Sequence, residues 1–229
     1  MLTRTVRALA LVLTATLAGG CKAFGGSFLL FGGHTPQEDL VSKAHAAERE
    51  AAESQDDFGA AILAYQRLTA PQALELEKLC DAFEDSVDSC ENRSEDLGER
   101  IDSIRREKDE LDKEWAKDLE RFSSDTVRKK SAAQLQETDA RTQRLIDELA
   151  RLQDKMKPVV LKLQDYRLFF DHNLNARAIA TLQDTYKDFD AESKALESEI
   201  GKAQGEIAAF LAFFVELQPP KPAASQPAK

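Results

Sequence analysis

Cysteine and histidine are the side chains best suited to metal binding or disulfide formation, and this chain has three of each. Cys80 and Cys90 fall on one predicted helix, about 15 Å apart along its axis, whereas a disulfide needs Cα atoms within about 7 Å. We therefore expect two buried thiols, with an intermolecular disulfide in a homo-oligomer as the alternative. His34, His45 and His172 share no metal-ligand spacing with one another or with a cysteine. The prediction is no metal site and no cofactor.

Catalytic patterns are equally hard to find. Carboxylate pairs occur as on any solvated helix face, and no Ser, His and Asp set stands out. Gly201-Lys202 lacks the upstream glycine and the following Ser or Thr of a phosphate-binding loop. The net charge of −10 disfavours nucleic acid, whose binders need a basic face. We expect neither an enzyme nor a nucleic-acid-binding protein.

Cys21 carries the clearest chemistry, because the residues before it have the order of a bacterial signal peptide. Arg4 and Arg7 form a basic start, an apolar run covers residues 8–18, and Leu17-Ala18-Gly19-Gly20 leads to the cysteine. This segment is too short to span a bilayer. It resembles the lipobox, in which lipoprotein signal peptidase cuts before a diacylated cysteine. An ordinary secreted protein cleaved nearby is the alternative.

The expected mature protein is therefore anchored to a membrane, on the periplasmic side of the cell envelope, through lipid on Cys21. Residues 1–20 would be the signal peptide, and residues 21–35, rich in Gly and Phe, would form a flexible tether with interfacial aromatics. In well-studied Gram-negative lipoproteins an Asp after the cysteine causes retention at the inner membrane. Lys22 therefore favours the outer membrane over the inner one.

A 3.5-residue apolar repeat begins after Thr35 and predicts four long helices. Thr35 and Glu38 suit a capping box, and the first helix should stop before Pro71. Pro158 should kink the third helix rather than end it, because the repeat stays in phase across it. The apolar positions of the repeat recur along each of the four predicted helices. They are Leu40 to Leu68, Leu76 to Phe122 including Trp115, Leu135 to Phe170, and Ile179 to Leu217 including Leu182 and Tyr186.

The phase of the repeat shows where the chain turns. It jumps by one residue at Pro71 and at Ser123-Ser124, and by two near residues 172–175, a jump that a continuous coiled coil does not absorb. Short turns join antiparallel helices. The predicted fold is all-α, a long antiparallel coiled-coil four-helix bundle (up-down-up-down) or paired helical hairpins, over residues 36–217. Residues 218–229 are Pro-rich and predicted to be disordered.

The turn near residue 172 is the least repetitive part of the helical region. Asn173 can adopt a left-handed cap, and Asn175 can cap the next helix. Arg177 places a cation beside the turn of an acidic chain. We predict that both this turn and the turn at Ala70-Pro71 lie at the end of the bundle away from the tether. His172, Asn173, Asn175 and Arg177 are the predicted partner contact. Alternatively, the asparagines only cap helices.

The stretch His172-Asn173-Leu174-Asn175-Ala176-Arg177-Ala178-Ile179 resembles the most recognisable motif of a bacterial family called domain of unknown function 2959. Further likenesses are Glu99-Arg100-Ile101-Asp102, Glu114-Trp115 and Met156-Lys157-Pro158-Val159, and together they span about residues 38–214. The resemblance implies a helical envelope protein and supplies no catalytic residues. The expected function is that of a structural spacer, scaffold or protein–protein adaptor. A periplasmic chaperone or adaptor for a transport or cell-wall system is the alternative.

Overall fold

The computed structural model describes residues 36–70, 75–182 and 186–217, all of which belong to one compact unit spanning His34–Lys229. The predicted signal peptide, Cys21, the tether and the Pro-rich tail lie outside these residues. Within the described part there are helices and no strands. The helices are α1 (Pro36–Leu68), α2 (Leu76–Arg121), α3 (Asp125–His172), α4 (Ala176–Ala180) and α5 (Tyr186–Leu217).

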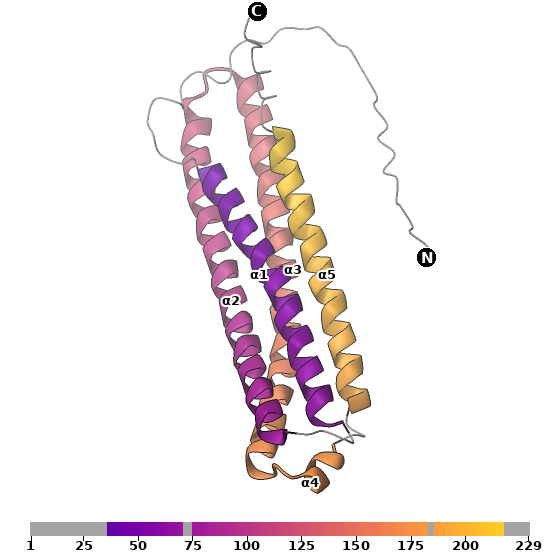
Figure 1. Ribbon diagram of the computed structural model, residues 1–229. Helices are drawn as coiled ribbons and strands as arrows, with labels where there is room; N and C mark the ends of the chain where they lie inside the picture. The colour runs from indigo at the N-terminus through magenta and orange to yellow at the C-terminus, as the bar shows by residue number, and fades with distance from the viewer. Residues whose placement is uncertain (1–35, 71–74, 183–185, 218–229) are drawn as a thin grey trace, which may run out of the picture. The chain divides into compact units, whose positions relative to one another are not determined.

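The four long helices form an antiparallel bundle (Figure 1). Each packs against two neighbours, α1 on α2, α2 on α3, α3 on α5 and α5 on α1. The chain therefore runs up, down, up and down, which confirms the predicted all-α four-helix fold. As predicted, α1 stops before Pro71, and α3 continues through Pro158.

The predicted heptad positions form the core along most of the bundle. On α1 they include the small side chains of Ala44 and Ala51 and the rings of Phe58 and Tyr65, all of which are almost completely buried. Alanine at these positions lets helix backbones approach closely, while the rings fill the wider layers. Facing positions on α2, such as Phe83 and Val87, are buried as well.

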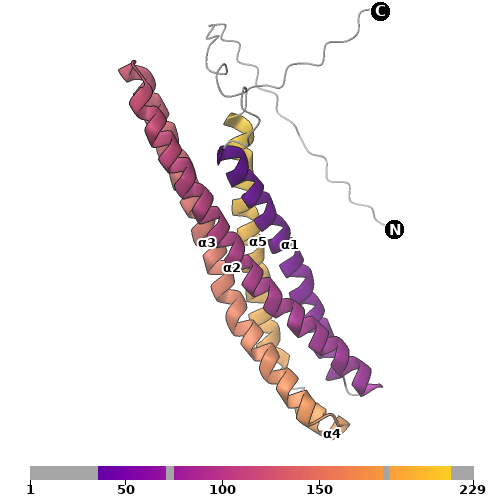
Figure 2. The same cartoon turned by 90° about the vertical axis from the view of Figure 1, so that its left-hand side faces the viewer.

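The α2–α3 hairpin extends beyond the other two helices, and here the predicted core is wrong (Figure 2). The last buried residue of α2 is Leu111 and the first of α3 is Thr138. Trp115, Phe122 and Leu135, which the repeat placed in the core, are only half-buried. The reason is length: α2 and α3 have 46 and 48 residues, whereas α1 and α5 have 33 and 32 and do not reach this far.

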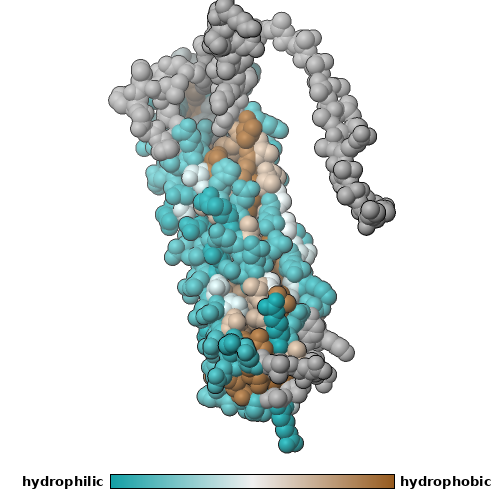
Figure 3. Space-filling view, viewed as in Figure 1, coloured by the Kyte–Doolittle hydropathy of each residue, from teal (hydrophilic) through white to brown (hydrophobic). Residues whose placement is uncertain are grey.

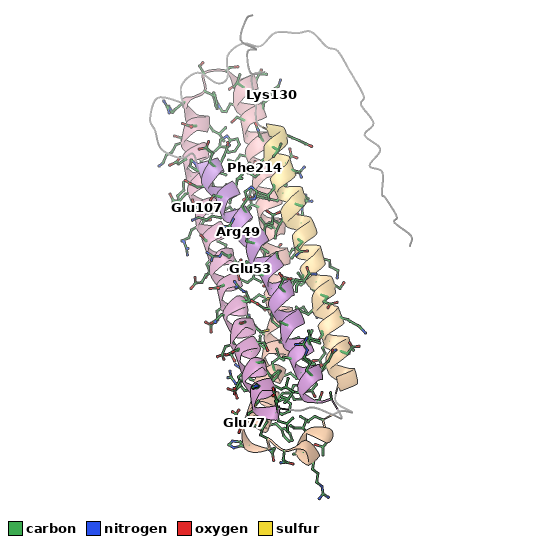
Figure 4. The ribbon with its side chains drawn as sticks, in the orientation of Figure 1. Arg49, Glu53, Glu77, Glu107, Lys130 and Phe214 are labelled. Carbon is green, nitrogen blue, oxygen red and sulfur yellow. The ribbon has the colours of Figure 1, made fainter. Side chains whose placement is uncertain are left out.

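Contacts of α1 and α5 show where the four-helix part ends. Near the start of α1, the Lys43 ammonium lies 3.9 Å from the carboxylate of Glu107 on α2. Near the end of α5, the Arg141 guanidinium of α3 lies 4.2 Å from the centre of the Phe213 ring. Figure 4 labels Glu107 and Phe214 at these levels, and Lys130 on the part of α3 beyond them.

A second prediction that needs correction is the continuous fourth helix from Ile179 through Leu182 and Tyr186. The chain instead forms the short α4, turns at Thr181 and Leu182, and begins α5 at Tyr186. The Leu182 carbonyl accepts a hydrogen bond from the Tyr65 hydroxyl of α1 at 3.3 Å, which ties this turn to the end of α1.

One charged side chain is buried between α1 and α2. Glu50 is 4% exposed, and its carboxylate lies 3.1 Å from Arg93 and 3.6 Å from Arg100. Arg93 also contacts Asp57 at 2.7 Å and Glu53 at 2.6 Å, and Glu53 is labelled on α1 in Figure 4. The hydrogen bond to Asp57 is the largest cause that raises the pKa of Arg93 above its ordinary value. These pairs set the register of α1 against α2.

The surface in Figure 3 is mainly hydrophilic, and apolar side chains on this face gather towards the two ends of the bundle. None of the described helices contains a stretch apolar enough, and with few enough charges, to cross a bilayer.

Candidate functional site at the turn between α3 and α4

The turn between α3 and α4 lies at the end of the bundle where α1 ends and α2 begins (Figure 1). Tyr65, in the last turn of α1, stacks against Phe170, in the last turn of α3, with ring centres 6.1 Å apart. The structure thus brings the Ala70 end of α1 and the 172–175 turn together, as predicted. Glu77, labelled in Figure 4, lies in the first turn of α2 at the same end.

A layer of aromatic rings from all four long helices supports this end. Tyr65 packs against Tyr166 at 4.6 Å and against Phe189 at 5.3 Å between ring centres. Phe83 and Phe170 meet edge to face at 5.4 Å. Edge-to-face and tilted pairs are favourable arrangements of ring quadrupoles. The last turn of α3 is therefore held on a packed base that fixes where the following turn projects.

The two asparagines of the turn act as caps. The Asn175 side chain accepts a hydrogen bond from the Ala178 N–H at 2.9 Å, which confirms it as the N-cap of α4. The prediction of a left-handed Asn173 is wrong, because its φ is −132°. Its side-chain amide instead donates to the Phe169 carbonyl at 3.0 Å, so it satisfies the end of α3 without a left-handed backbone.

His172 and Arg177 differ from the asparagines because both are exposed, and neither forms an ion pair within the described residues. Leu174, between the two caps, is 36% exposed. The asparagines therefore shape the turn, while His172, Leu174 and Arg177 are available for contact. That these residues bind a partner stays a prediction.

A cluster that sequence reasoning missed lies beside this turn. Cys80 and Glu84 of α2 and Asp171 of α3 place one sulfur and two carboxylate oxygens within 4.8 Å of one another. The Cys80 Sγ is 3.6 Å from Glu84 Oε1. Burial, followed by the nearby Glu84 carboxylate, raises the pKa of the Cys80 thiol to about 11. Burial, followed by the hydrogen bond with Asp171, raises the pKa of Glu84.

The two described cysteines are both buried and free, which confirms the predicted buried thiols within the chain. They have different surroundings. Cys90 is 0% exposed, and its pKa is raised to about 12, mainly by burial. Only Cys80 belongs to the carboxylate cluster among the described residues. The spacing of Cys80 and Glu84, four residues on one helix face, was visible in the sequence, but their approach to Asp171 depends on how α2 and α3 pack.

The sequence was compared with families of known proteins. A family model described as "Protein of unknown function (DUF2959)" matches residues 30–214. The chain belongs to this family. The match agrees with the likeness seen over about residues 38–214. No curated protein and no solved structure matches the chain significantly.

The DUF2959 segment covers α1 to α4 and α5 as far as Phe214. It contains the turn with His172 and Arg177 and also the cluster of Cys80, Glu84 and Asp171. Both features thus belong to the family domain itself rather than to the regions on either side of it.

Proposed function

We propose that this DUF2959 protein is an envelope lipoprotein, anchored by acylated Cys21, whose bundle acts as a spacer or adaptor and whose α3–α4 turn binds a protein partner. The observation that carries the proposal is the position of that turn. α1 begins at the opposite end of the bundle from the turn (Figure 1). A tether that joins the lipid to Pro36 would leave the turn facing away from the membrane.

The composition of the turn supports binding to an anionic partner. Arg177 is exposed on a chain with a net charge of −10, and it forms no ion pair within the described part. A guanidinium can form two parallel hydrogen bonds to a carboxylate, which favours acidic surfaces as partners. The caps at Asn173 and Asn175 hold this side chain on a short, well-defined helix. Loops on rigid scaffolds often carry function.

Proximity crosslinking from the turn in living cells, followed by mass spectrometry, tests the proposal. A photo-crosslinker at Leu174 should capture a defined envelope protein, and Arg177→Glu should abolish that crosslink without changing the melting temperature. Asn175→Ala is the matched control, because loss of the cap should cost about 1 kcal/mol of stability. If Arg177→Glu leaves both the crosslink and envelope phenotypes unchanged, the docking role is wrong.

A periplasmic chaperone is the second candidate, because two leucines on α3 face solvent. Leu161 and Leu168 are 62% and 57% exposed and lie seven residues apart on one face of the helix. Exposed apolar surface of this kind can bind unfolded chains. Crosslinkers at Leu161 that capture many different proteins, while Leu174 captures none, would favour this function over the adaptor.

A further inference from the structure

Cys80, Glu84 and Asp171 have a donor set that no described role uses. A thiol is a soft donor, and carboxylates are hard donors. Mixed sets of this type suit Zn²⁺, whereas Mg²⁺ and Ca²⁺ prefer oxygen alone. The three donor atoms come from the first turns of α2 and the last turn of α3 and lie within 4.8 Å of one another.

One of the three donor separations already fits zinc. Bonds of about 2.0–2.3 Å place the ligands of a tetrahedral zinc about 3.3–3.8 Å apart. The observed separation of Cys80 Sγ from Glu84 Oε1, 3.6 Å, already falls in that range. Cys80 and Glu84 are four residues apart on α2, a spacing that places two ligands on one face of a helix.

The burial of the thiol distinguishes this cluster from a group of surface carboxylates. Cys80 is 4% exposed, yet its Sγ is directed into the cluster and has no polar contact outside it in the described structure. Cys90 is also buried, at 0% exposure, but among the described residues it belongs to no such three-donor group. The Cys80 side chain therefore sits where a metal ligand would, with two carboxylates beside it.

We propose that Cys80, Glu84 and Asp171 bind a zinc ion, with water at the fourth position. On binding, the Cys80 thiol loses its proton to solvent and the thiolate coordinates the metal. The zinc would join α2 to α3 directly beneath the exposed turn and offset two of the three negative charges of the Cys80 thiolate and the two carboxylates. This site is independent of whether the turn binds a protein.

The test uses the purified full chain after removal of metals with a chelator. Equilibrium dialysis against Zn²⁺ should give one tightly bound ion per chain. Co²⁺ should produce the near-ultraviolet charge-transfer absorption of a cobalt–thiolate bond. Cys80→Ser should remove that absorption. Asp171→Asn, a change at an exposed position that should not affect folding, should weaken zinc binding by more than about tenfold, since even outer-shell partners contribute that much.

Cys90→Ala is the matched control, a change of a buried cysteine on the same helix, and it should retain full zinc binding and the cobalt absorption. Zinc should also raise the melting temperature of the wild type and of Cys90→Ala, but not of Cys80→Ser. The proposal is overturned if cobalt gives no thiolate absorption, or if Cys90→Ala removes it. It is also overturned if zinc binding is the same in Asp171→Asn as in the wild type, which would indicate adventitious binding to surface carboxylates.

Discussion

At the scale of single residues, the buried carboxylate of Glu50 depends most strongly on its ion-pair partners. A charge without solvent is costly unless it is paired and hydrogen-bonded. Glu50 forms an ion pair with Arg93 at 3.1 Å and a longer one with Arg100 at 3.6 Å. Most other ion pairs of the described helices join groups three or four residues apart, and exposed pairs of this kind contribute little.

Arg93→Ala should therefore destabilise the bundle strongly. The change leaves Glu50 buried with only the more distant Arg100, and we expect a loss of about 3 kcal/mol in the free energy of unfolding, measured by urea denaturation. Arg121→Ala is the control. Arg121 is 81% exposed and pairs with Asp118 at 3.0 Å, so its loss should change stability by less than about 0.5 kcal/mol. Equal effects of the two changes would contradict the importance assigned to the buried pair.

At the scale of helices, Gly98 on α2 leaves space that a side chain of α3 fills. A Cβ built at this residue would lie 2.5 Å from the Gln153 amide nitrogen, which donates to the Ser94 carbonyl at 3.0 Å. Gly59 on α1 is also inside a helix, but a Cβ there would meet nothing within 4 Å. Alanine substitutions at the two glycines therefore distinguish the effect of helix propensity on stability from the effect of contacts between helices.

Gly59→Ala should stabilise the protein by up to about 1 kcal/mol, the difference in helix propensity between the two residues. Gly98→Ala should give little or no gain, because Gln153 must move and its hydrogen bond, worth about 1 kcal/mol, is lost. Thermal melting of the two variants checks this. Adding Gln153→Ala to Gly98→Ala removes the clash, so the double variant should regain the stability expected from helix propensity. A full gain in melting temperature in Gly98→Ala alone would show that the Gln153 side chain moves aside freely.

At the scale of the whole molecule, the bundle has two different ends. One end carries the start of α1, the end of α5 and the protruding α2–α3 hairpin (Figure 2), and the other carries the α3–α4 turn and the Cys80 cluster. The proposed lipid anchor would attach next to the first end. The orientation of every proposed contact therefore depends on Cys21.

Cys21→Ser should move the protein from the membrane fraction to the soluble fraction, because the variant cannot carry the proposed lipid. Cell fractionation with immunoblotting measures this. Lys22→Asp is the matched control, since it keeps the cysteine and should change only which membrane holds the protein. A Cys21→Ser protein that stays on membranes, together with an unmodified N-terminus in the wild type, would exclude lipid anchoring.

Much of the architecture follows from the sequence alone. Heptad spacing depends only on local periodicity, so it located the long helices, the buried rings such as Tyr65 and Phe83, and the breaks between α1 and α2 and between α2 and α3. Capping is also local, which is why Asn175 was predicted correctly as an N-cap. The lipobox before Cys21 stays a prediction, and it rests on the order and spacing of residues and likewise needs no fold.

The tertiary structure decided what depends on distance between helices. Periodicity does not say how far a neighbouring helix reaches, so Trp115 and Phe122 were assigned to a core that ends at Leu111. The hydroxyl of Tyr65 donates to the Leu182 carbonyl, between α4 and α5, from another helix, and local periodicity does not show this contact. Asp171 joins Cys80 and Glu84 only because α2 and α3 run antiparallel in one register. Local pattern determines the helices, whereas helix lengths and register determine which side chains meet.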